Sequence, residues 1–168
     1  CMRLGADIIV NTDGDNQYCG EDIKKLVAPI LKGQADMVVG DRQTDHVPHF
    51  SPVKKKLQKL GSFVVRTLSE TSVPDAVSGF RAFSREAALQ MNIVSSFSYT
   101  IETVIQAGKK HLAVASVPIR TNPKTRESRL FKSIPNFIRN QVATIVRMYT
   151  MYQPMRVFFY IGFLMILA

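Results

Sequence analysis

Two aspartates stand one residue apart in the segment Asn11-Thr-Asp13-Gly-Asp15-Asn-Gln17, directly after the apolar run 7–10. Such a run, bounded by turn formers, predicts a buried strand, and open α/β sheets bind ligands beyond the carboxyl ends of their strands. Two carboxylates and a nearby side-chain carbonyl can converge on Mg²⁺ or Mn²⁺, whose shell is usually completed by water and diphosphate oxygens. An ordinary Asx-rich turn is the alternative. The preceding strand and the glycine between the acids favour a metal site.

A second candidate site follows another short apolar run, residues 36–40, in the step Val38-Val-Gly-Asp41-Arg42. Glycine lets backbone approach a ligand closely, and arginine can clamp a phosphate with two parallel hydrogen bonds. A surface pair between the neighbouring aspartate and arginine is the alternative interpretation. A third segment, Ser78-Gly-Phe-Arg81, predicts by itself only a strand with a glycine, over 77–83.

A fourth candidate is the proline-hinged loop 120–131, which carries four cations within ten residues: Arg120, Lys124, Arg126 and Arg129. Such a run is usually a solvated face. Next to a membrane it would attract anionic headgroups, at about 1 kcal/mol for each cation, or it would bind one phosphate specifically. The sequence leaves these alternatives open.

The elements that position these segments are alternating strands and helices. Strand 7–10, helix 20–32 and strand 36–40 form a βαβ unit, which predicts a parallel sheet and an α/β fold. Helices are expected over 53–68, 85–91 and 99–108, the last two capped by Ser84 and Ser98, and a further strand over 112–119.

The C-terminal third is basic and apolar. Residues 1–108 hold 12 Lys and Arg against 12 Asp and Glu, whereas 109–168 hold ten against one, which is the whole net charge of +9. An apolar stripe from Ile134 to Tyr152 predicts an amphipathic helix on a membrane surface. The uncharged run 157–168 is shorter than the roughly 20 residues of a membrane span, so we expect the start of a truncated one; a buried core helix is the alternative. Basic flanks place its N-terminal side in the cytoplasm.

Composition excludes several classes of protein. A hydrophobic content of 46% excludes a disordered chain, and two cysteines without a CxxC spacing exclude a disulfide scaffold. The cations adjoin an apolar run, and the chain has no zinc-finger or aromatic RNA-binding motif. We therefore expect a membrane partner and no nucleic acid.

In this order the four segments resemble those of family 2 glycosyltransferases of the GT-A fold, and the likeness runs from about Ala6 to the end of the chain. They are most similar to the polyprenyl-phosphate transferases of the dolichol-phosphate mannose synthase type, which carry C-terminal transmembrane helices. The resemblance implies the C-terminal portion of a Rossmann-like domain with a mostly parallel sheet, without its N-terminal nucleotide-binding half. We expect this partial catalytic domain over 1–132, a juxtamembrane helix over 133–153 and a truncated transmembrane helix over 154–168.

The resemblance also implies roles for individual residues. Asp13 and Asp15 would bind the donor diphosphate and, with Gln17, the metal ion; Asp15 and Arg42 would be catalytic. The acceptor phosphate would contact Arg42, Lys56, Lys124, Arg126 and Arg129. Lys54 and Lys55 compete with Lys56 for its role. Arg126 stands where several relatives have glycine, so which loop cation contacts the lipid stays open.

The implied activity is inverting transfer of a sugar from a UDP- or GDP-sugar to dolichyl or undecaprenyl phosphate, by a membrane enzyme whose catalytic domain lies on the cytoplasmic face. Whether the truncated chain is active alone is left open. The alternative function is a non-catalytic peripheral membrane-binding module that uses only the basic C-terminal third.

Overall fold

The computed structural model describes residues 2–43, 52–94, 99–123 and 134–167; for 2, 52–58 and 134–137 it describes the backbone alone. Every strand and helix expected from the sequence is present, with boundaries moved by up to four residues. The elements are β1 (Ile8–Asn11), α1 (Ile23–Leu31), β2 (Met37–Asp41), α2 (Pro52–Ser69), β3 (Arg81–Ser84), α3 (Arg85–Gln90), α4 (Tyr99–Lys109), β4 (Val114–Pro118), α5 (Ile134–Tyr152) and α6 (Pro154–Leu167), with short 3-10 turns at Met2–Leu4 and Gly20–Asp22.

The four described strands form a mixed sheet in the order β1-β3-β2-β4. Strand β3 runs antiparallel to both of its neighbours, and only β2 and β4 pair in parallel. The expectation of a mostly parallel sheet is therefore wrong for these strands. The βαβ unit exists, but β3 enters between its two strands, and the local pattern of a four-residue strand does not encode that insertion.

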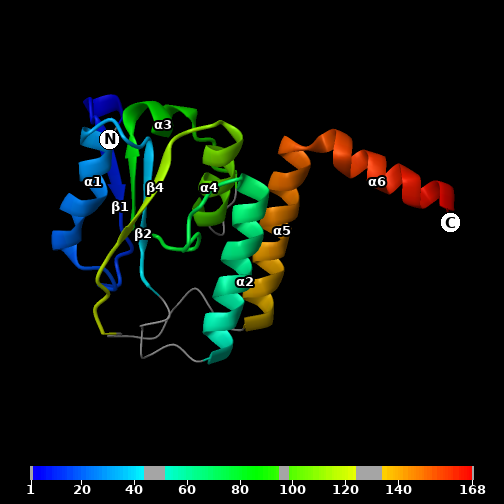
Figure 1. The fold of residues 1–168 in the computed structure, drawn as a ribbon, viewed down its shortest axis with the longest axis horizontal. Helices are drawn as coiled ribbons and strands as arrows, with labels where there is room; N and C mark the ends of the chain where they lie inside the picture. Colours follow the sequence, from blue (N-terminus) through cyan, green and yellow to red (C-terminus); the bar gives the residue numbers. More distant parts are fainter. Residues whose placement is uncertain (1, 44–51, 95–98, 124–133, 168) are drawn as a thin grey trace.

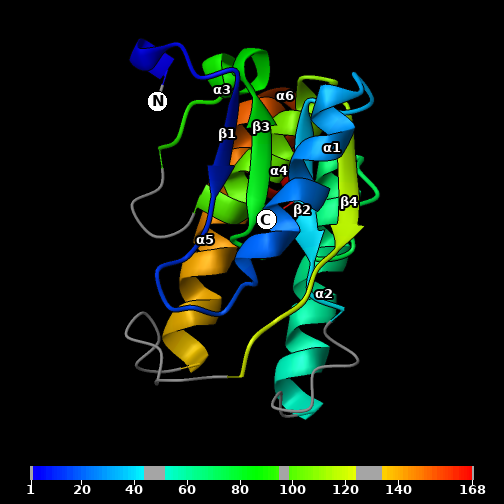
Figure 2. The same cartoon turned by 90° about the vertical axis from the view of Figure 1, so that its left-hand side faces the viewer.

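Each face of the sheet has its own hydrophobic core, because successive strand residues point to opposite faces. Met37, Val39 and Phe83 pack with apolar residues of α2, α4 and α5, whereas Val38 and Ala82 pack on the side of α1. Figures 1 and 2 show α1 on one face and the α2–α4–α5 layer on the other. Two faces covered by helices leave the strand ends as the open edge of the domain.

Serine caps helix α3 as predicted. Ser84 Oγ accepts a hydrogen bond from the Ala87 N–H at 3.1 Å, which satisfies a backbone donor that the first helical turn leaves free. The second predicted cap, Ser98, lies outside the described residues.

The apolar residues predicted to form one stripe along α5 are partly packed against the core and partly exposed to solvent. Ile145 and Tyr152 pack against the core, together with the buried Met148, whereas Ile138 and Val142 are exposed. Helix α6 leaves the domain after a bend of 103° from α5, and Figure 1 shows it projecting away from the sheet. Within the described ranges no single helix is long and apolar enough to cross a membrane, although α5 and α6 together reach the required length and composition.

Candidate active site

The register of the sheet brings three sequence segments to one edge. Asn11 at the end of β1 and Val39 near the end of β2 both pair with Arg81, the first residue of β3. The C-terminal ends of β1 and β2 therefore lie beside the N-terminal end of β3. This places the turn 13–17, Arg42 and the segment 78–80 together.

The turn 13–17 is an Asx turn at its second acid. Asp15 Oδ1 accepts the Gln17 N–H at 3.0 Å. The loop after β4 holds the turn from outside, because the Asn122 side chain donates to the Asn16 carbonyl at 3.0 Å and the Asn122 N–H donates to the Gln17 carbonyl at 2.9 Å. The loop predicted to bind the acceptor thus begins in direct contact with the turn predicted to bind the metal.

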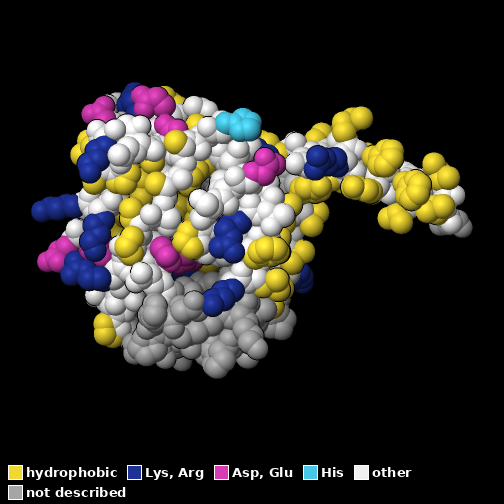
Figure 3. Space-filling view, viewed as in Figure 1, with side chains coloured by type: hydrophobic (Ala, Val, Ile, Leu, Met, Phe, Trp, Pro, Cys, Tyr) yellow, Lys and Arg dark blue, Asp and Glu magenta, His cyan; other side chains and the backbone are white. Residues whose placement is uncertain are grey.

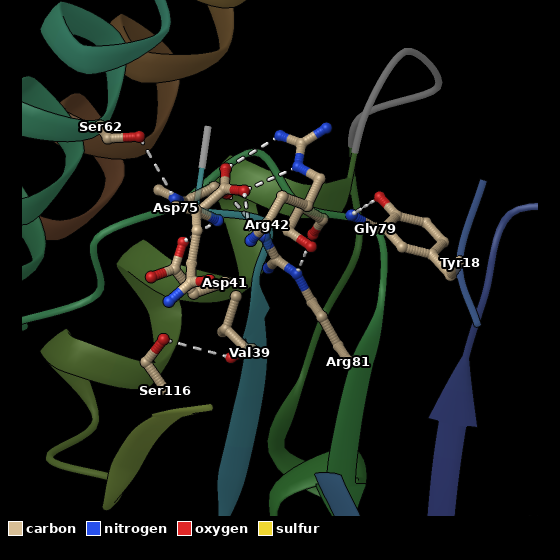
Figure 4. A network of polar contacts seen from close by, with 12 residues as sticks. Tyr18, Val39, Asp41, Arg42, Ser62, Asp75, Gly79, Arg81 and Ser116 are labelled. Atoms are coloured by element: carbon tan, nitrogen blue, oxygen red, sulfur yellow. Dashed lines mark hydrogen bonds and ion pairs between the residues drawn. The ribbon is translucent and has the colours of Figure 1, made fainter. Parts of the chain in front are cut away.

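The first acid, Asp13, lies against the backbone of Gly79. A β-carbon built on Gly79 would stand 2.9 Å from Asp13 Cγ, a distance that side chains essentially never reach. Two tyrosines fix this glycine. Its N–H donates to Tyr18 Oη at 3.1 Å (Figure 4), and the Tyr99 hydroxyl donates to its carbonyl at 3.0 Å. The segment around Gly79 is therefore part of the site.

Asp13 is electrostatically suited to a cation. Its pKa is raised from the ordinary value, first by loss of solvent around the carboxylate and second by the negative charge of Asp15. The positive charges of Arg42 and Arg81 and a hydrogen bond with Tyr18 act in the opposite direction. A carboxylate whose charge is disfavoured by a like charge is stabilised by a bound divalent ion.

The donor set at this site fits a hard cation. Asp13 and Asp15 offer oxygen ligands, and in the described part of the chain no group of three or more Asp, Glu, His and Cys side chains is arranged to hold a metal ion by itself. Two carboxylates with the remaining positions left to water and diphosphate oxygens are typical of Mg²⁺ and Mn²⁺ sites, and unlike the nitrogen and sulfur sites of zinc. The backbone of Gln17 stabilises the turn, because its N–H donates to Asp15 and its carbonyl accepts from Asn122. That the Gln17 side chain is a metal ligand stays a prediction.

Arg42 is buried, with 9% of its surface exposed, and forms an ion pair with Asp75. Its Nε lies 2.7 Å from Asp75 Oδ2 and its Nη2 lies 2.9 Å from Oδ1 (Figure 4). Burial lowers the pKa of the guanidinium, but the hydrogen bonds and charge of Asp75 outweigh burial and leave the pKa above its ordinary value. The alternative of a surface pair with the adjacent Asp41 is therefore wrong.

Arg81 is fully buried and organises the segment before β3. It donates to the carbonyls of Ser78, Ala76 and Thr100 at 2.7, 2.6 and 2.5 Å and to Thr103 Oγ1 at 2.6 Å. Burial lowers its pKa to about 10, so it remains charged at neutral pH. It joins the turn 76–78 to α4.

Of the predicted acceptor-binding cations, Arg42 alone has a described side chain. Lys56 lies on α2, where the backbone alone is described, and Lys124, Arg126 and Arg129 lie outside the described residues. Arg120, at the start of the same loop, donates from Nη2 to Glu21 at 2.9 Å and to Asp22 at 3.0 Å. Arg120 therefore ties the loop to the 3-10 turn before α1.

Three residues of the site were not singled out by sequence reasoning: Tyr18, Asp75 and Tyr99. Tyr18 directly follows Gln17, so its position beside a candidate metal turn was a usable signal. Asp75 lies in the irregular chain between α2 and β3, and Tyr99 begins a helix; no spacing connects either of them to the site.

Comparison with curated proteins identifies relatives that are longer than this chain. The chain is 36% identical over 124 residues to UDP-N-acetylglucosamine--dolichyl-phosphate N-acetylglucosaminyltransferase of Methanococcus voltae, covering 71% of the chain and 49% of that protein. It is 30% identical over 138 residues to the low-salt glycan biosynthesis hexosyltransferase Agl6 of Haloferax volcanii, covering 80% of the chain and 33% of that protein. The chain thus spans half or less of the length of these relatives.

Solved structures of the same fold include glucosyl-3-phosphoglycerate synthase of Mycobacterium tuberculosis. Its complex with phosphoglyceric acid superposes with a TM-score of 0.62 at 18% identity, over 88% of this chain and 51% of that one. The complex of the same enzyme with Mn²⁺, UDP-glucose and phosphoglyceric acid gives 0.61 at 17% identity, with the same coverage. At this identity the likeness shows the fold, a GT-A-like α/β fold.

The family model for glycosyl transferase family 2 matches residues 3–91. This match contains β1, the Asp13–Gln17 turn, Arg42, Asp75 and Gly79. It covers more than half of the chain and confirms the resemblance: the chain belongs to glycosyl transferase family 2.

Proposed function

We propose that the protein containing this chain is an inverting glycosyltransferase that moves a sugar from a UDP- or GDP-sugar to a polyprenyl phosphate at the cytoplasmic face of a membrane. The observation that carries the proposal is the convergence of the Asp13–Asp15 turn, Gly79 and the Arg42–Asp75 pair at one edge of the sheet. Anionic and cationic groups side by side suit a reaction between a metal-bound diphosphate and a phosphate. The name of the Methanococcus voltae relative, which includes a UDP-sugar donor and a dolichyl-phosphate acceptor, supports the same class of substrates.

In the proposed reaction, a phosphate oxygen of the lipid attacks the anomeric carbon of the donor sugar from the side opposite the diphosphate. A new C–O bond forms, the bond from the anomeric carbon to the diphosphate oxygen breaks, and the electron pair leaves with the nucleoside diphosphate. A phosphate monoester has a second pKa near 6 and is largely dianionic at pH 7, so no protein group has to remove a proton. The anomeric centre is inverted.

The residues of the site have separate tasks in this reaction. Asp13 and Asp15 would hold the divalent ion, which offsets the negative charge that develops on the departing diphosphate. Arg42 would bind and orient the acceptor phosphate. Gly79 keeps the space beside Asp13 free of a side chain, and Tyr18 and Tyr99 fix the position of that glycine.

The exposed apolar surface supports a membrane partner. Figure 3 shows hydrophobic side chains along the length of α6, and residues such as Phe159, Leu164 and Ile166 are 65–84% exposed. Because α6 meets α5 at 103°, a membrane entered along α6 would have α5 nearly in its plane, with the exposed Ile138 and Val142 available to the lipid. Basic residues Arg147 and Arg156 would then lie near anionic headgroups.

The test is an assay of the full-length protein with radiolabelled UDP- and GDP-sugars and polyprenyl phosphate in detergent. Labelled product should partition into the organic phase, disappear with EDTA and return with added Mn²⁺ or Mg²⁺. The variant Asp13→Asn should lose transfer, whereas Asp7→Asn, which removes an exposed carboxylate just before the same strand, should retain it. Metal-independent transfer to a soluble glycan would contradict the proposal. Vesicle binding without any transfer would favour the peripheral membrane module.

A further inference from the structure

The Arg42 guanidinium is held side-on by both oxygens of Asp75. Nε and Nη2 donate to separate oxygens at 2.7 and 2.9 Å, and the Arg42 backbone N–H approaches Oδ2 at 3.4 Å. A guanidinium has five N–H donors, and two of them are used in this pair. Among the described residues, Nη1 makes no hydrogen bond. Arg42 keeps 9% of its surface exposed, and the donors on Nη1 are not used by Asp75.

Asp75 is itself fixed by neighbours that do not touch Arg42. The next peptide is bound from two sides: the Ala76 N–H donates to Ser62 Oγ of α2 at 3.3 Å, and the Ala76 carbonyl accepts from Arg81 Nη2 at 2.6 Å. The Ser78 N–H closes a turn on the Asp75 carbonyl at 3.3 Å. The Asp75 carboxylate therefore belongs to a turn between α2 and β3 that several hydrogen bonds hold in place (Figure 4).

The Arg42 guanidinium lies within electrostatic range of the turn 13–17 and of Tyr18. Asp13 and Tyr18 both act on the Arg42 charge, and Arg42 acts in return on Asp13. Because Asp75 binds Nε and Nη2, it determines which N–H groups of Arg42 are left for another partner.

From this geometry we infer that Asp75 is the positioning residue of the acceptor site: it orients the Arg42 guanidinium so that its remaining N–H donors meet the phosphate of the acceptor lipid. The inference rests on the proposed function. The buried Arg42–Asp75 pair has zero net charge and therefore attracts a dianion less than a free arginine would. Asp75 would therefore contribute to the reaction by orienting the attacking phosphate oxygen rather than by strengthening its binding. Preorganised donors avoid the entropy of ordering a long side chain when the ligand binds.

The test compares Asp75→Asn with wild type in the full-length protein, using short-chain polyprenyl phosphate as the variable substrate. Asp75→Asn should lower kcat/KM for the acceptor at least about tenfold, while the donor Kd stays within twofold and the number of donor sites per protein stays unchanged. Asp36→Asn, at the opposite end of the strand that leads to Arg42, is the matched control and should stay within twofold of wild type for both substrates.

A double-mutant cycle with Arg42→Ala separates positioning from a purely structural role. If Asp75 acts through Arg42, then Asp75→Asn has no further effect on acceptor kcat/KM once Arg42 is alanine. Equal losses in both backgrounds, or an acceptor kcat/KM within twofold of wild type, would overturn the inference. If Asp75→Asn does not fold, Asp75→Glu replaces it in the cycle and should show an intermediate, equally Arg42-dependent loss. A wild-type protein that forms no lipid-linked product would overturn the proposed function together with this inference.

Discussion

The carboxylate of Asp13 and the backbone of Gly79 are in direct apposition, with no room for a β-carbon between them. This contact joins the turn after β1 to the segment before β3, and the two tyrosines that bind Gly79 make the position rigid. The turn 13–17, which we propose binds the metal ion, is thus shaped by a glycine far away in the sequence. The segment 78–80, whose sequence predicts only the start of a strand, therefore lines the candidate site.

Replacing Gly79 by alanine should disturb Asp13 more than the fold. The added methyl overlaps Asp13 Cγ, so the carboxylate has to turn away from the cation, and we expect Mn²⁺ affinity to fall about tenfold, as for the loss of partners that orient a ligand. The check is the rise in Tm that saturating Mn²⁺ produces, which should shrink in the variant. Gly61→Ala, on α2 with open space around it, should leave that rise unchanged; equal responses of both variants would contradict the contact's role.

Removing the buried guanidinium of Arg81 should destabilise the domain strongly. Arg81→Met fills similar volume but leaves the carbonyls of Ala76, Ser78 and Thr100 without this donor. Unsatisfied buried polar groups cost about 1–3 kcal/mol each, and relaxation will recover part of the sum, so we expect a loss of about 3 kcal/mol. Urea unfolding followed by circular dichroism measures it. Arg3→Met, at an exposed site, should change stability by less than about 0.5 kcal/mol; a similarly small change at Arg81 would show that its network is dispensable.

Asp22 should make stability depend on pH in the acid range. Burial raises the pKa of its carboxylate, but hydrogen bonds from Arg120 and Lys25 outweigh burial and hold that pKa far below its ordinary value. A depressed pKa in the folded state means that the stabilisation is complete above about pH 5 and is lost as the pH falls below about 4. Asp22→Asn should therefore lower the unfolding free energy by about 1–3 kcal/mol at pH 7 and flatten its dependence between pH 2 and 5. Parallel pH curves for variant and wild type would refute this assignment.

Local features of the fold were predictable because they depend on local patterns. The strand before Asp13 was identified from its β-branched run, and the cap of α3 from Ser84 in front of a helical segment; both are present. Family membership was also predictable, because four short segments in a fixed order are more specific than any one of them, and the family match confirms it.

Long-range pairings were not predictable from the same patterns. The insertion of β3 between β1 and β2 depends on which strand edges meet, and a four-residue strand does not specify its partner. Similarly, Arg42 was expected beside a phosphate, but its pairing with Asp75 depends on the turn that α2 and Arg81 hold in place. Such contacts depend on tertiary structure, whereas sequence periodicity reports only local conformation.

Binding of Mn²⁺ to the full-length protein, measured by electron paramagnetic resonance without any donor or acceptor, tests most directly whether Asp13 and Asp15 form a metal site. Wild type and Asp7→Asn should bind one ion per protein with equal affinity. Asp13→Asn and Asp15→Asn should each weaken binding by at least about 100-fold, since even outer partners of metal ligands contribute roughly 10–100-fold. Unchanged Mn²⁺ binding in both aspartate variants would contradict the account.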